Sequence, residues 1–269
     1  MTFDKEYFNL GYLDRLSYRN TVIHRLDPRA KVITTMLFVT LVISYPKYEV
    51  TSLVPFFLFP ILISALSDTP FMYILKRVII VSPFAVFIGI FNPFFDAGRV
   101  VLPAGMTISS GWISFFSIMI KFTLTVSAAL LLIATTSFPG VCQALHKLGV
   151  PSIFTSQLLF LYRYIFVLAE EAMRMVRARD VRSFEGTGTG LRFFARLMGI
   201  LFIRTVERSE RIYNAMLSRG FHGTFPDMRP PRFGMGDALF TLFTAAVLVA
   251  IRLFNITEMA GQFVQRLTG

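Results

Sequence analysis

Five stretches of apolar residues constrain this chain more than any other feature, because a fold must bury each stretch or surround it with lipid. The first two are close together, separated only by Pro46, Lys47, Tyr48 and Glu49. A helix that crosses a bilayer needs about 20 mainly apolar residues. We therefore expect each stretch to cross once, with the first two forming a tight helical hairpin. The stretches cover residues 32–45, 50–66, 74–95, 112–136 and 238–251.

The composition agrees with a membrane protein. Hydrophobic residues make up 54% of the 269 residues and charged residues 16%, whereas a soluble domain carries about 25% charged residues. The single cysteine, Cys142, excludes an intramolecular disulfide and a CxxC metal site. The predicted fold class is all-α: a polytopic membrane protein with about five transmembrane helices that uses the lipid bilayer as its solvent.

The positions of the basic residues predict the orientation. With the amino terminus in the cytoplasm, 22 of the 27 lysines and arginines lie on the cytoplasmic side. The outside then holds only Lys47, Arg99, Arg252 and Arg266. Because cytoplasmic loops are rich in Lys and Arg, we expect a multi-pass protein of the cell membrane with its amino terminus and the basic segment 147–232 in the cytoplasm.

The segment between the fourth and fifth stretches predicts two long helices. The first covers about residues 152–179, and the second covers 191–219 and ends at Gly220, a residue typical of the position after a helix. Glu170 and Arg174 form an i,i+4 pair on the first, as Glu207 and Arg211 do on the second. Three glycines alternate with threonines between the helices and predict a hinge: Gly186, Gly188 and Gly190.

Both helices end with an arginine in the last turn, Arg179 in one and Arg219 in the other. Periodicity alone leaves two interpretations open. The arginines can be ordinary C-terminal residues that face the partial negative charge of the helix end, or they can be contact residues for a partner protein.

At these helix ends the sequence resembles the transmembrane T component of energy-coupling factor (ECF) transporters, the CbiQ/EcfT family. The string from Arg208 to Gly223 is a specific match. So is Leu26-Asp-Pro-Arg-Ala-Lys31, which in the family precedes the first span. The resemblance covers about residues 15–250, and it makes the contact interpretation of the two arginines the expected one.

The resemblance implies a subunit that is not an enzyme and holds no cofactor. It would transmit the ATP-driven motion of two ATPase subunits to a substrate-binding membrane subunit. In the family, two motifs of the form Ala-Arg-Gly or Ala-Arg-Ser end two long cytoplasmic helices that cross in an X, and each motif docks on one ATPase. The matching residues here are Ala178, Arg179 and Asp180, and then Ser218, Arg219 and Gly220.

Three parts follow from this layout. Residues 1–136 would hold an amino-terminal cytoplasmic segment and transmembrane helices 1–4. Residues 137–236 would form the cytoplasmic coupling domain, and residues 237–269 the last transmembrane helix with a carboxyl-terminal tail. Asp180 departs from the family, which usually has Gly or Ser there, and its carboxylate could partly neutralise Arg179.

The transported substrate has two candidates. The stretch from Tyr12 to Arg25 is similar to the cobalt and nickel branch of the family, which predicts cobalt or nickel import. A shared T component of a vitamin transporter is the alternative. The three histidines, His24, His146 and His222, are far apart and offer no metal site; in the family the metal is held by the separate substrate-binding subunit.

The sequence gives little support to other classes of function. No P-loop, HExxH or GxSxG pattern occurs, so ATP must be hydrolysed by another chain. A polytopic membrane enzyme is the alternative from another class, but the apolar stretches carry almost no carboxylates or histidines. A nucleic-acid partner is not expected, because the regular apolar stripe of the basic segment favours packing against protein.

Two polar residues near the membrane invite local interpretations. Asp27 is expected to cap a helix that has Pro28 at its first position. Lys121 is the one charge in the fourth stretch. A charge within a span is a functional candidate, but the favoured interpretation is that Lys121 snorkels to the interface or forms a buried pair.

Overall fold

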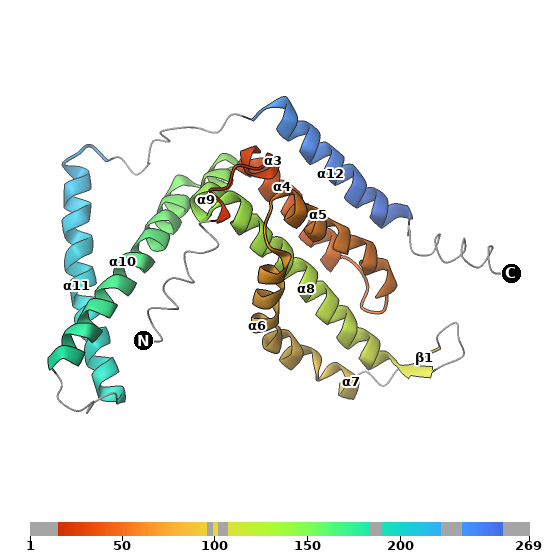
Figure 1. Ribbon diagram of the computed structural model, residues 1–269, viewed down its shortest axis with the longest axis horizontal. Coiled ribbons are helices and arrows are strands. Elements are labelled where there is room, and N and C mark those ends of the chain that lie inside the picture. Colours follow the sequence, from red (N-terminus) through yellow and green to blue (C-terminus); the bar gives the residue numbers. More distant parts are fainter. Residues whose placement is uncertain (1–15, 96–98, 102–106, 183–189, 222–232, 255–269) are drawn as a thin grey trace. The chain divides into compact units, whose positions relative to one another are not determined.

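The computed structural model describes residues 16–95, 99–101, 107–182, 190–221 and 233–254 (Figure 1). The chain divides into two compact units. The bundle unit consists of Asp14–Ser137 with Pro231–Gly269, and the two-helix unit of Met1–Leu13 with Phe138–Pro230.

The bundle unit is built almost entirely from helices, as the sequence predicts. One short antiparallel ladder is added to them, in which Arg99 pairs with Ser109. The helices are α3 (Val22–Arg25), α4 (Pro28–Ile43), η1 (Thr51–Phe57), α5 (Leu58–Leu66), α6 (Phe71–Gly89), α7 (Asn92–Phe95), α8 (Ser110–Thr136) and α12 (Met235–Phe254), and the strands are β1 (Arg99–Val101) and β2 (Thr107–Ser109).

Large apolar side chains from α4, η1, α5, α8 and α12 form the core of this unit. The rings of Phe38 and Phe59 stack with centroids 4.5 Å apart, and Tyr45 meets Phe56 edge-on at 5.4 Å. A second cluster joins α6 to α8 through Ile74, Val78 and Leu131. Helix α8 belongs to both clusters, so it is the central helix of the bundle unit.

Glycine is required where α8 begins. A Cβ atom at Gly111 would lie 2.5 Å from the Pro93 Cα and 2.7 Å from the Asn92 carbonyl oxygen. These neighbours are backbone atoms that cannot move aside, so the absent side chain is what allows α7 to pack against the start of α8.

The candidate spans differ in part from the five stretches. Helices α6, α8, α10 and α12 are each long and apolar enough to cross a membrane. The first two stretches form shorter elements, α4 and the pair η1–α5, because Pro46 follows the end of α4 and Pro55 lies within η1. The prediction of an all-helical, polytopic membrane protein is confirmed, and α10 is one more helix that meets the length and composition of a span.

The two-helix unit contains α9 (Phe138–Lys147), α10 (Ser152–Arg182) and α11 (Leu191–Leu217). Helix α9 folds back on α10, where the rings of Phe138 and Tyr162 stack with centroids 4.7 Å apart. Helix α10 has 31 residues and α11 has 27, which at about 1.5 Å a residue makes them about 46 and 40 Å long. Both long helices that the sequence predicts are therefore present.

Candidate functional site

The first candidate triplet lies in the last turn of α10. Ala178 and Asp180 are exposed, whereas the Arg179 side chain is only 20% exposed. The guanidinium Nη1 of Arg179 lies 3.8 Å from Oδ1 of Asp180. The carboxylate that distinguishes this triplet from the family pattern thus forms an ion pair with the arginine beside it.

The second triplet ends α11 in a different geometry. The Phe221 N–H donates to the Met216 carbonyl and the Gly220 N–H to the Leu217 carbonyl, each at 3.0 Å. This pair of bonds is the Schellman motif. It needs a left-handed residue, and Gly220 supplies it with a φ of 77°. The prediction that the helix stops at Gly220 is correct, and the motif leaves Arg219 exposed beside a residue without a side chain.

Helices α10 and α11 are joined by an ion pair well inside each helix. The Arg204 guanidinium donates to the Glu171 carboxylate at 2.5 Å. Along α10, Arg179 lies eight residues beyond this contact, or about 12 Å, and along α11, Arg219 lies fifteen residues beyond it, or about 22 Å. Figure 1 shows that α10 and α11 run in opposite directions. The two triplets therefore extend from opposite sides of the contact.

A groove with mixed lining runs beside this ion pair. Leu168 and Leu201 line it with aliphatic side chains, and Glu207, Arg208 and Arg211 with charged ones. The predicted i,i+4 pairs are confirmed: Arg174 donates to Glu170 at 2.6 Å, and Arg211 and Glu207 approach to 3.9 Å. These exposed pairs support each helix by itself, whereas the Glu171–Arg204 contact is a polar link between the helices.

Of the three predicted hinge glycines, Gly186 and Gly188 lie outside the described residues. Gly190 occupies the N-cap position of α11 with an extended backbone, φ −73° and ψ 167°. This conformation is open to any residue, so Gly190 is not required by the geometry of the helix start.

A polar cluster joins the starts of α4 and α12 in the bundle unit. Asp27 caps α4, since its Oδ1 accepts from the Arg29 N–H at 2.8 Å with Pro28 at the first helical position. The prediction of this cap is confirmed. The Asp27 N–H in turn donates to Oδ1 of Asp237 at 2.7 Å, and Oδ2 of Asp237 accepts from the Gly234 N–H at 2.8 Å.

Lys31 connects the same cluster to the end of α8. Its side chain is buried, and its Nζ donates to the Thr135 carbonyl at 2.8 Å. The carbonyls at a helix C-terminus carry partial negative charge and favour a cation. Burial lowers the pKa of nearby His24, which favours its neutral form. Lys31 supplies a cation to this helix end.

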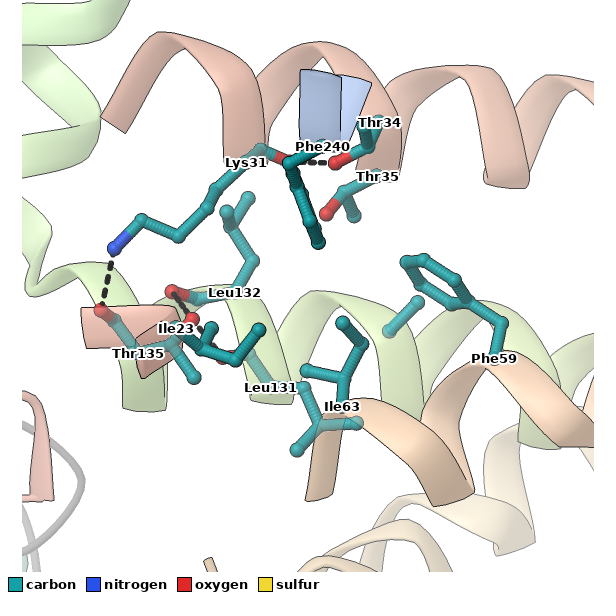
Figure 2. A pocket seen from close by; sticks show the side chains of 11 residues that line it. Ile23, Lys31, Thr34, Thr35, Phe59, Ile63, Leu131, Leu132, Thr135 and Phe240 are labelled. Carbon is teal, nitrogen blue, oxygen red and sulfur yellow. Dashed lines mark hydrogen bonds between the residues drawn. The ribbon is translucent and has the colours of Figure 1, made fainter. Parts of the chain in front are cut away.

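Figure 2 shows the cavity beside Lys31, with Thr34, Thr135 and Phe240 among its lining residues. Its volume of about 20 Å³ suits one water molecule. Among the described residues, no three His, Cys, Asp or Glu side chains gather as ligands for a metal ion.

Lys121 forms a polar contact beyond the C-terminal end of α4. Its Nζ donates to the Tyr45 carbonyl at 2.6 Å, and the Arg252 guanidinium donates to the Ser44 carbonyl at 3.4 Å. Arg252 also lies over the Tyr45 ring, 3.8 Å from its centroid. Two cations thus face the carbonyls of the two residues that follow α4, which accounts for Lys121 by packing and hydrogen bonding.

Sequence reasoning did not find the partners of Lys31 and Asp237. An Asp three residues after Gly234 is a recognisable helix-start signal, so the local bond to Gly234 could have been predicted. The bond to Asp27 joins residues 210 positions apart, and no local pattern carries that information.

Comparison with known proteins places the chain among membrane transport components. The family model described as cobalt transport protein, CbiQ, matches residues 19–230. An uncharacterised protein of Methanocaldococcus jannaschii is 29% identical over 91% of this chain and 86% of its own. The energy-coupling factor transporter transmembrane protein EcfT of Thermosediminibacter oceani is 25% identical over 86% of this chain and 92% of its own. The cobalt transport protein CbiQ of Salmonella typhimurium is 30% identical over 37% of this chain and 44% of its own.

Proposed function

Since the chain belongs to the CbiQ family of cobalt transport proteins, whose members are non-catalytic membrane subunits without a cofactor, we propose that it couples two ATPase subunits to a substrate-binding membrane subunit. The T component transmits the motion of the ATPases and leaves ATP hydrolysis to them. The proposed substrate is cobalt or nickel.

The observation that carries this proposal is the pair of arginine-bearing helix ends on opposite sides of the α10–α11 contact. Arg179 lies in the last turn of α10, and Arg219 lies two residues after the end of α11. One chain thereby offers two separate docking ends, which suits two ATPase subunits better than one. Moving the end of either helix would change the angle at which α10 and α11 cross at the Glu171–Arg204 contact. The motion of one ATPase would therefore also reach the helix that the other ATPase holds.

Cobalt is favoured by the matching family model and by the partial match to CbiQ of Salmonella typhimurium. The shared vitamin module is the second candidate, because the match to EcfT of Thermosediminibacter oceani extends over most of both chains. Uptake assays with cobalt(II), in competition with nickel(II) or with a vitamin mixture, separate the two. Cobalt uptake that a vitamin mixture suppresses would favour the second candidate.

The complex tests the proposed function directly. Purified alone, the chain is expected to show no ATP hydrolysis above background, because its sequence has no P-loop. Reconstituted with its ATPase and substrate-binding subunits, it is expected to support hydrolysis and import. The control is a complex whose ATPases lack the P-loop lysine, which should assemble without hydrolysing ATP. Steady hydrolysis by the isolated chain would contradict the proposal.

The proposed orientation places the two-helix unit in the cytoplasm. Two single cysteines test it, one replacing Glu210 on α11 and one replacing Lys47 after α4, both exposed residues. In intact cells, an impermeant thiol reagent is expected to label Lys47→Cys strongly and Glu210→Cys at least tenfold less. The parent chain is the control, since its only cysteine, Cys142, is buried. The reverse pattern would show the opposite orientation.

A further inference from the structure

We propose that Asp237 is a positioning residue that pins the start of α12 to the start of α4 and makes this end of the bundle unit the fixed base for the motion of the two-helix unit. The inference rests on the proposed function, because it assigns the part that stays still while the ATPases act. It assigns Asp237 no contact with substrate or nucleotide.

The geometry of the carboxylate supports this role. Asp237 is 8% exposed, and each of its oxygens accepts a backbone N–H, one from Asp27 and one from Gly234. Bonds from N–H groups to a carboxylate are stronger than those between neutral groups. The same carboxylate therefore closes the first turn of α12 and holds the first turn of α4.

The bonds of Asp237 lie close to a point where the chain passes between the two-helix unit and the bundle unit. The two-helix unit is inserted between α8 and α12, so the chain enters it after Thr136 and returns before Gly234. Lys31 holds the end of α8 through the Thr135 carbonyl, and Asp237 holds the start of α12. Both covalent attachments of the two-helix unit are thus tied to the first turn of α4.

The electrostatics of the cluster are consistent with a permanent contact. Lys31 interacts favourably with both Asp27 and Asp237, and all three residues are buried. At the far end of α4, Arg252 from α12 and Lys121 from α8 donate to the carbonyls of the two residues that follow the helix. Helices α8 and α12 are therefore held to α4 at both ends, and force applied through either attachment is met by the same helix.

The test uses the complete complex in liposomes, with cobalt(II) as the transported probe. In Asp237→Asn, one oxygen remains as an acceptor and the other is replaced by an NH₂ group that cannot accept. We expect normal amounts of bound ATPase and ATP hydrolysis within twofold of the unaltered complex, but about tenfold less cobalt transported per ATP. The matched control is Asp68→Asn, the same change at an exposed turn residue of the bundle unit, which should leave the ratio unchanged.

If Asp237→Asn transported as much cobalt per ATP hydrolysed as the unaltered complex, the inference would be overturned. Failure of the proposed function has a different signature, because the unaltered complex would then bind no ATPase or import no probe.

Hydrogen–deuterium exchange on the unaltered complex tests the inference without any variant or transported probe. The amides of Asp27 and Gly234 are expected to stay protected both with and without ATP, while amides in α10 and α11 change their exchange. Rapid exchange at Asp27 and Gly234, or ATP-dependent exchange there as large as in α11, would show that this end of the bundle unit is not the fixed base. This result would overturn the inference even if Asp237→Asn failed to assemble.

Discussion

Replacing Arg179 and Arg219 together by alanine is expected to abolish ATPase docking and transport while leaving the chain inserted in the membrane. An arginine in a partner's groove makes several fixed, charge-assisted hydrogen bonds. Removing one partner of such a buried contact costs about 2–5 kcal/mol, or roughly thirtyfold to several thousandfold in affinity. The two ends act together, because docking of one raises the effective concentration of the other.

The single variants are expected to differ. Arg219 is exposed beside Gly220, where a partner can approach closely. Arg179 already pairs with Asp180 at 3.8 Å, and part of that interaction must be given up when a partner binds. Arg219→Ala should therefore weaken docking more than Arg179→Ala. Copurification of tagged ATPase with each variant, combined with uptake assays, measures both effects.

The matched control is Arg196→Ala, which removes an exposed arginine of α11 that belongs to neither triplet. It should leave docking within about twofold of the unaltered chain, since isolated surface charges contribute little. If the double variant copurifies with a normal amount of ATPase and transports normally, the two arginines only cap their helices and the coupling proposal is wrong.

Replacing Lys31 by methionine is expected to destabilise the bundle unit more than any other single change of a charged residue in it. The variant keeps much of the apolar stem but leaves Asp27 and Asp237 buried without their shared cation, and it removes the bond to the Thr135 carbonyl. Leaving the buried Thr135 carbonyl without its donor costs about 1–3 kcal/mol. For a chain of this size, that loss lowers the melting temperature by about 5 °C.

Thermal unfolding of the purified chain in detergent, followed by the fluorescence of its single tryptophan, Trp112, measures this effect. Lys47→Met is the matched control, because Lys47 is exposed outside α4, and its melting temperature should change by no more than about 1 °C. If Lys31→Met had the same melting temperature as Lys47→Met, the polar contacts of Lys31 would add no net stability.

The parts that the sequence predicts well are those set by local pattern. The apolar stretches, the cap of Asp27 on α4 and the stop of α11 at Gly220 each depend on neighbouring residues, and each appears in the structure. The split of the second stretch into η1 and α5 was missed, although Pro55 within that stretch is a visible signal against a regular helix.

Contacts between distant residues escaped prediction because no short pattern encodes them. The sequence left open whether Lys121 is a functional charge, snorkels to the interface or forms a buried pair. In the structure its Nζ lies 2.6 Å from the Tyr45 carbonyl oxygen. The Glu171–Arg204 ion pair likewise joins helices whose crossing point periodicity does not specify. For the candidate site, the sequence located both triplets, but the surroundings that distinguish Arg179 from Arg219 came from the fold.

Those different surroundings have a consequence for symmetry. Two ATPase subunits of identical sequence would meet unlike ends on this chain: an arginine neutralised in part by Asp180 on α10, and an exposed arginine followed by a left-handed glycine on α11. Under the proposed function, a pair of identical ATPases would therefore be held asymmetrically, with one bound more tightly than the other. The T component would therefore set the order in which the two ATPase subunits bind to it and dissociate from it.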